Sequence, residues 1–121
     1  MKVLLIEDDD FIARMYAKKF TLEKFVTMVA NDGEAGLMLA KKELPNIILL
    51  DIMLPKMNGW EVLEQLKRDP STQAIPVILL TNIGAPEDIQ KGFDLGAVDY
   101  LIKAHFIPDE VVKKINSIVT P

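Results

Sequence analysis

The chain has 121 residues, of which 50% are hydrophobic and 26% are charged, a composition typical of one soluble globular domain, which we predict to span residues 1–121. Its net charge of −4 argues against a direct nucleic-acid partner, because phosphate backbones are bound by basic patches. The absence of cysteine excludes disulfides and thiolate metal sites, and no apolar run is long enough to cross a membrane. Without a recognisable targeting segment, the default prediction is a cytoplasmic protein.

Five short apolar runs predict β-strands, and they alternate with amphipathic patterns that predict helices. The strands are expected at 3–6, 25–30, 47–50, 75–80 and 98–102, the second of them at an edge of the sheet because it is less apolar than the first. The helices are expected at 10–22, from 33 to 42 or 43, at 58–68, at 86–96 and from 108 onward. Helical spacing places Phe11, Met15, Met38 and Phe93 among the side chains that face the sheet.

This alternation predicts an α/β fold. Right-handed crossovers between successive strands give a doubly wound, five-stranded parallel sheet with helices on both faces. The flavodoxin-like strand order 2-1-3-4-5 would place the ends of the first and third strands side by side, at the point where such sheets bind their ligands.

Polar residues stand at the ends of the predicted strands. Glu7, Asp8, Asp51, Thr81 and Lys103 each end or follow a strand, so this strand order gathers them at one edge of the sheet. Two carboxylates about 4 Å apart repel by roughly 4 kcal/mol at an effective dielectric near 20, and a hard divalent cation would offset that repulsion. Magnesium is the natural candidate, because it takes oxygen ligands and often adds a phosphate. With Lys103 and Thr81 available to phosphoryl oxygens, Asp51 can be the nucleophile that accepts a phosphoryl group.

Four segments in this order resemble the receiver domain of bacterial response regulators, and the resemblance covers the whole chain: LIEDD at 5–9, LLDIMLPKMNG at 49–59, VILLT at 77–81 and LGAVDYLIK at 95–103. The resemblance implies a magnesium site made by Glu7, Asp8, Asp51 and the backbone carbonyl of Met53. It therefore implies a protein of two-component signalling that works with magnesium.

The resemblance also assigns the residues of a phosphorylation switch. Asp51 would be the phosphoacceptor, supplied by a sensor histidine kinase or a phosphotransfer protein. Thr81 would be the switch hydroxyl, Lys103 the phosphate-binding lysine, and Tyr100 the aromatic residue that rotates inward on activation. The response would then be read at the face built by the fourth helix, fifth strand and fifth helix, by a downstream protein or by homodimerisation.

Several positions depart from the family pattern. Proline usually follows the lysine, often after a cis bond, whereas here Ala104 follows it; the residue after the switch threonine is usually small, and Asn82 is not. Met53 and Ile83 lie two residues beyond Asp51 and Thr81, where polar side chains in related receivers can orient the hydrolytic water. Because both are apolar, we predict that they restrict water access and slow the loss of the phosphoryl group. The alternative is that both simply pack.

We predict a stand-alone signalling switch, not an enzyme, whose output passes to another protein because no DNA-binding domain follows Pro121; the alternative is that the chain is a fragment of a larger regulator. Two other functions stay open. A small phosphatase could use the same aspartyl nucleophile, although the dehalogenase-like kind needs a second aspartate where Met53 stands. The other is a binding module that works without phosphorylation. If it bound flavin, it would need a phosphate-binding loop after the first strand, where the acidic residues 7–10 repel phosphate. The single histidine, His105, is assigned to a loop or cap rather than to a phosphorelay.

Overall fold

A computed structural model describes residues 1–119, so Pro121, the predicted end of the domain, lies outside the described part. Five strands within it form one parallel sheet in the order β2-β1-β3-β4-β5. The strands are β1 (Lys2–Ile6), β2 (Val26–Ala30), β3 (Ile47–Leu50), β4 (Val77–Thr81) and β5 (Asp99–Ile102). The predicted doubly wound α/β fold is therefore confirmed, with β2 at an edge.

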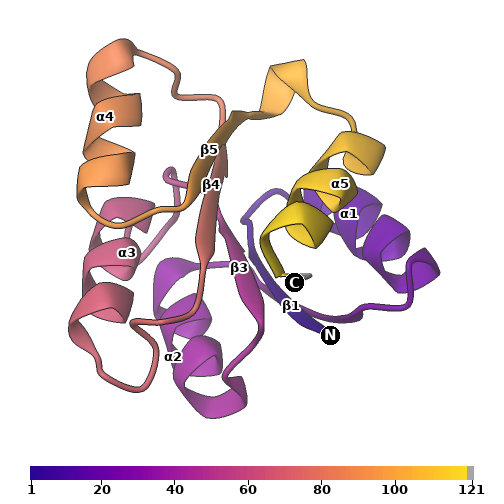
Figure 1. The fold of residues 1–121 in the computed structure, drawn as a ribbon, viewed down its shortest axis with the longest axis horizontal. Coiled ribbons are helices and arrows are strands. Elements are labelled where there is room, and N and C mark those ends of the chain that lie inside the picture. Colours follow the sequence, from indigo (N-terminus) through magenta and orange to yellow (C-terminus); the bar gives the residue numbers. More distant parts are fainter. Residues whose placement is uncertain (120–121) are drawn as a thin grey trace.

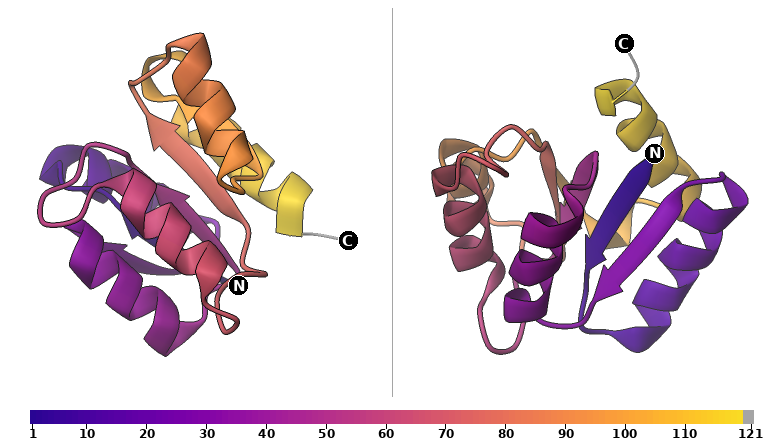
Figure 2. Two further views of the ribbon diagram at one scale, coloured as in Figure 1. Left: turned by 90° about the vertical axis from the view of Figure 1, so that its left-hand side faces the viewer. Right: turned by 90° about the horizontal axis from the view of Figure 1, so that it is seen from below.

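Helices cover both faces of the sheet (Figure 1). They are α1 (Asp10–Leu22), α2 (Gly33–Glu43), α3 (Gly59–Arg68), α4 (Pro86–Asp94) and α5 (Pro108–Val119), with a short 3-10 helix η1 (Lys103–His105). Figure 1 shows α2, α3 and α4 on one side and α1 and α5 on the other, and the right-hand view of Figure 2 shows the same separation from below. Asp9, Asp32 and Asn58 cap the first three helices by accepting a backbone N–H of the first turn.

Two apolar cores lie between the sheet and its helices. Side chains of β1 alternate between them: Leu4 and Ile6 pack on the side of α2 and α3, while Val3 and Leu5 pack on the side of α1 and α5. The four residues of β3 are all buried, as expected for a central parallel strand covered on both faces. This packing fixes the positions of the carboxyl ends of the strands, where the polar residues gather.

The prediction that Phe11, Met15, Met38 and Phe93 face the sheet is wrong, because all four are exposed, Phe11 to 77% and Met38 to 69%. Helix α1 buries Ala13 and, as the helical spacing predicts, Tyr16 and Phe20. Phe11 and Met15 each lie two positions from Ala13, about half a turn around a helix of 3.6 residues per turn. Helix α2 likewise approaches the sheet through Gly36 and Ala40, which leaves Met38 on the outer side.

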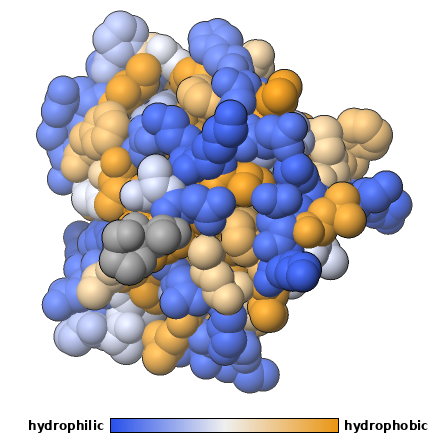
Figure 3. Space-filling model, turned by 45° about the vertical axis from the view of Figure 1, so that its right-hand side comes forward, coloured by the Kyte–Doolittle hydropathy of each residue, from blue (hydrophilic) through white to orange (hydrophobic). Residues whose placement is uncertain are grey.

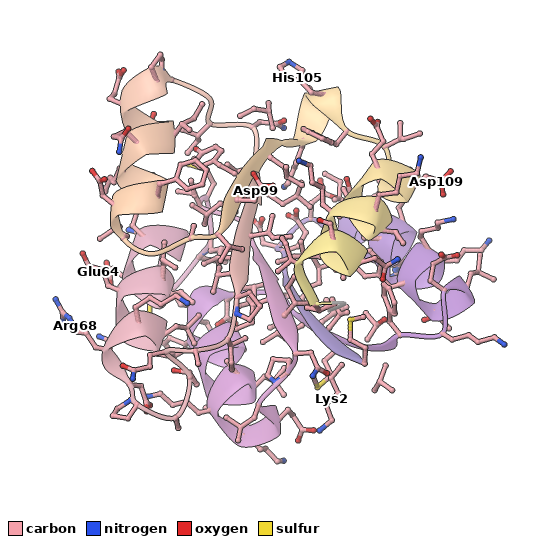
Figure 4. The ribbon with its side chains drawn as sticks, in the orientation of Figure 1. Lys2, Glu64, Arg68, Asp99, His105 and Asp109 are labelled. Atoms are coloured by element: carbon pink, nitrogen blue, oxygen red, sulfur yellow. The ribbon has the colours of Figure 1, made fainter. Side chains whose placement is uncertain are left out.

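Charged and polar side chains make up much of the surface on the side seen in Figure 3, with hydrophobic ones scattered between them. His105 lies in η1, is exposed, and points away from the protein in Figure 4. Within residues 1–119, no helix combines the length and the apolar character that crossing a membrane requires.

Candidate functional site

Three carboxylates meet where β1 and β3 end. Ile6 pairs with Leu50 across the two strands, so the residues that follow, Glu7 and Asp51, are neighbours at the edge of the sheet. One carboxylate oxygen from each of Glu7, Asp8 and Asp51 lies within 4.8 Å of the others. Glu7 and Asp51 are only 1% and 6% exposed, whereas Asp8 is exposed to solvent. The predicted acidic cluster is thus present, with two of its members buried.

Lys103 follows β5 and reaches the two buried carboxylates. Its Nζ donates a hydrogen bond to Oδ2 of Asp51 at 2.8 Å and also pairs with Glu7. One ammonium among three carboxylates leaves an excess of two negative charges. A divalent cation that prefers oxygen ligands, such as magnesium, fits both this charge and this set of donors.

The buried groups have shifted pKa values. Burial raises the pKa of Glu7 above its ordinary value, although the hydrogen bond from Lys103 lowers it in part. Burial alone would lower the pKa of Lys103, but its hydrogen bonds to Asp51 and Glu7 outweigh burial and raise it. Lys103 therefore stays protonated at neutral pH. The site as a whole favours additional positive charge, either a proton on Glu7 or a bound cation.

Both carboxylate oxygens of Asp51 have partners. Oδ1 accepts the backbone N–H of Ile52 at 2.7 Å and that of Met53 at 3.4 Å, while Oδ2 accepts from Lys103. The backbone therefore fixes the orientation of the carboxylate. Only the contact of Oδ2 can be released by the movement of one flexible side chain.

Ile83 connects Thr81 with Tyr100. Thr81 ends β4 and is buried, and its hydroxyl oxygen accepts the N–H of Ile83 at 3.4 Å. Tyr100, on the neighbouring strand β5, is also buried, and its hydroxyl donates to the carbonyl of Ile83. Burial, then the charges of Asp88 and Asp51, raises the pKa of Tyr100 to about 12, so the hydroxyl keeps its proton at neutral pH. The Tyr100 ring faces inward in this structure.

A cavity of about 510 Å³ opens beside the acids, and most of its lining is apolar. Its walls are Asp8, Ile52, Met53, Leu54, Pro55, Asn58, Trp60 and Ile83. The structure thus brings Met53 and Ile83, predicted to restrict water, to one cavity that Asp8 also lines. Trp60 is half-buried there, with Nζ of Lys91 4.5 Å from its ring centroid. Nothing in the sequence around Trp60 marks it as a cavity wall, because that place depends on how the loop after β3 folds.

Two of the departures from the family pattern contact each other. The backbone N–H of Ala104 donates to Oδ1 of Asn82 at 3.2 Å. A proline at position 104 would have no N–H to donate, so the alanine makes this contact possible. The described residues contain no cis peptide bond, and the bond between Lys103 and Ala104 is therefore trans.

Comparisons with known proteins point to one family. The family model described as the response regulator receiver domain matches residues 3–116. The chain is 36% identical over 118 residues to the DNA-binding dual master transcriptional regulator RpaA of Synechocystis, covering 98% of this chain and 48% of RpaA. It is similar to the solved receiver domain of the Francisella response regulator 1452, with a TM-score of 0.90, 32% identity and coverage of 98% and 95% of the two chains. It is also similar to the Mn(2+)-bound form of response regulator Rcp1, with a TM-score of 0.83, 30% identity and coverage of 96% and 91%. The chain spans about half the length of RpaA and less of some other curated relatives.

Proposed function

The chain belongs to the response regulator receiver domains, and on that premise we propose that Asp51 accepts a phosphoryl group in two-component signalling. The observation that carries this proposal is the buried Asp51 carboxylate, fixed by two backbone N–H groups and paired with Lys103 beside two further acids. The donor would be a phosphohistidine of a sensor histidine kinase or phosphotransfer protein. In the transfer, an oxygen of Asp51 forms a bond to phosphorus as the phosphorus–nitrogen bond breaks, and the leaving imidazole takes up a proton.

We propose that magnesium is held by Glu7, Asp8 and Asp51, with the carbonyl of Met53 as the resemblance implies. The excess of two negative charges and the all-oxygen donors support this assignment. The manganese named for the similar regulator Rcp1 is consistent with a divalent site in such a fold. When bound, the metal would neutralise charge on the phosphoryl oxygens.

The protein's own side chains would then hold the product. Lys103 Nζ, now on Oδ2 of Asp51, would move to a phosphoryl oxygen. The Thr81 hydroxyl would donate to another phosphoryl oxygen and so give up its contact with the N–H of Ile83. Because the carbonyl of Ile83 accepts a hydrogen bond from the Tyr100 hydroxyl, movement of the backbone at Ile83 would alter this contact of Tyr100 on β5.

The output would pass through the face of α4, β5 and α5, either to a separate protein or to a second copy of the chain. Phe93 and Val98 are exposed apolar residues of this part of the fold, which supports a protein partner. RpaA is named as DNA-binding, but the chain spans only half of it, and the net charge of −4 favours a protein partner over direct contact with nucleic acid. A cytoplasmic location stays a prediction.

We propose a switch that accepts its own phosphoryl group, not an enzyme. The test incubates the protein with magnesium and acetyl phosphate, follows intact mass and phosphate release, and repeats the binding with beryllofluoride. A receiver retains one phosphoryl group and binds beryllofluoride. Sustained release of phosphate without a modified protein would instead indicate the phosphatase, and no response to either reagent would indicate a binding module.

A further inference from the structure

The loop after β3 rests on the first residue of α2, in addition to its contacts with the acidic site. This loop, residues 52–58, carries the two N–H groups that fix Asp51 and is followed directly by α3. The N–H of Gly33 donates to the carbonyl of Pro55 at 3.2 Å. An ion pair of 3.8 Å joins the exposed Lys56 to the partly buried Asp32 at the same place. Helix α2 therefore contacts the loop at residues other than Ile52 and Met53, whose N–H groups contact Asp51.

Gly33 leaves no room for a side chain at this contact. A Cβ on Gly33 would overlap the carbonyl oxygen of Met57 and lie 2.6 Å from its carbonyl carbon and 2.9 Å from its Cβ. Two of these three atoms belong to the backbone, so no rotation of a side chain can relieve the overlap. The loop would have to shift. Glycine here is not explained by helix formation, because alanine has the higher helix propensity.

We infer that Gly33 is a positioning residue for the loop after β3. Because Gly33 has no side chain, its backbone sets the place of Pro55–Met57, and through them the place of Ile52 and Met53 beside Asp51. This inference rests on the proposed function, because it concerns the magnesium site of that function. Residues that hydrogen-bond a metal's ligands orient those ligands, and changing them typically lowers metal affinity about 10–100-fold. Gly33 acts on the proposed ligands through Pro55–Met57.

Gly36 provides a matched control on the same helix. A Cβ on Gly36 would meet three side-chain atoms of Ile6 at 2.5, 2.8 and 2.8 Å, and its N–H donates to Asp32 within the helix. Gly36→Ala therefore meets the side chain of Ile6 on β1 rather than the backbone of the loop after β3. Both substitutions add one methyl group to a buried glycine.

The experiment measures magnesium affinity of wild type, Gly33→Ala and Gly36→Ala by the fluorescence of Trp60, which lines the cavity with Asp8. We expect Gly33→Ala to weaken magnesium binding by about 10–100-fold and Gly36→Ala to leave it within about threefold of wild type. In the metal-free proteins, the amide chemical shifts of Ile52 and Met53 should move in Gly33→Ala and stay in place in Gly36→Ala. Equal magnesium affinity in the two variants, with unmoved amides, would overturn the inference. Absence of magnesium binding by wild type would instead overturn the proposed function.

A wild-type measurement tests the same inference should Gly33→Ala fail to fold. In a magnesium titration followed by NMR, the amide of Gly33, bonded to the loop, should shift with the amides of Ile52 and Met53. The amide of Gly36, bonded within α2, should shift far less. A Gly33 amide that stays as still as that of Gly36 while the loop amides move would contradict the inference.

Discussion

Lys103 offsets part of the negative charge of the acidic site before any metal binds. It pairs with both buried carboxylates, Glu7 and Asp51, and leaves Asp8 facing solvent. The sequence predicts that these residues share one edge of the sheet, because each stands at a strand end. It does not predict that Lys103 bridges Glu7 and Asp51, because a long flexible side chain can reach several partners and only the folded backbone selects among them.

Removing this ammonium should destabilise the metal-free protein strongly. We expect Lys103→Met to cost roughly 3–5 kcal/mol of unfolding free energy in EDTA, because two buried carboxylates lose their partner. Lys114→Met is the control, because the pair of Lys114 with Asp99 at 3.4 Å is partly exposed and worth only about 0–1 kcal/mol. Urea unfolding measures both, and magnesium should restore part of the loss in Lys103→Met only. Equal losses in the two variants would show that Lys103 does not neutralise the site.

Met53 and Ile83 should determine how long the phosphoryl group survives. Hydrolysis needs a water in line with the leaving carboxylate, and both residues line the cavity beside the acids without offering a hydrogen bond to it. We expect Met53→Asn and Ile83→Glu, and most of all the double variant, to shorten the phosphoryl half-life. Met38→Asn changes an equally exposed methionine on the outer side of α2 and should leave the half-life unchanged. An unchanged half-life in the double variant would mean that the two residues only pack.

At the scale of elements, the strands are more predictable from this sequence than the buried faces of the helices. Runs such as 47–50 are apolar throughout, and all five strands lie within a few residues of their predicted places. Small residues are among the buried positions of three helices: Ala13 in α1, Gly36 and Ala40 in α2, and Gly92 in α4. A pattern of large apolar residues overlooks these positions, and it assigns exposed residues such as Phe11 and Met38 to the core.

Ile83 links the two strands that carry the proposed switch residues. Thr81 accepts the N–H of Ile83, and Tyr100 donates to its carbonyl. We expect Thr81→Ala to accept a phosphoryl group at Asp51 while the signals around Tyr100 no longer respond. NMR spectra of the variant with and without beryllofluoride check this. Full phosphorylation-dependent shifts around Tyr100 in Thr81→Ala would show that coupling takes another route.

The end of α3 supplies a test by pH. Asp69 caps this end and accepts hydrogen bonds from the N–H and hydroxyl of Ser71 at 2.8 and 2.7 Å, which lower the pKa of its carboxyl below the ordinary 3.8. A lowered pKa stabilises the folded state above 3.8, and that contribution is lost as the pH falls through the folded value. We expect Asp69→Ala to lower the melting temperature at neutral pH, by an amount that shrinks in acid below 3.8. A difference that stays constant across this range would mean that the charge of Asp69 is irrelevant.

At the scale of the whole molecule, the residues of the proposed site lie at one end of the sheet, and we expect the rest of the fold to transmit a change made there. The acids follow β1 and β3, Lys103 follows β5, and Thr81 ends β4, so four of the five strands contribute to one edge. From there, the contacts of Ile83 lead to Tyr100 on β5, next to α4 and α5. The sequence predicts this arrangement because a parallel sheet aligns the carboxyl ends of all its strands. The orientations of the side chains are the main feature that only the structure shows.

The central claim is that Asp51 itself carries the phosphoryl group. The most direct measurement treats the protein with magnesium and a phosphoryl donor, reduces the acyl phosphate with borohydride, and locates the reduced residue by tandem mass spectrometry. The account predicts reduction at Asp51 alone, absent without magnesium and absent in Asp51→Asn. Reduction at Asp8, or none at Asp51 in a folded protein that binds magnesium, would contradict it.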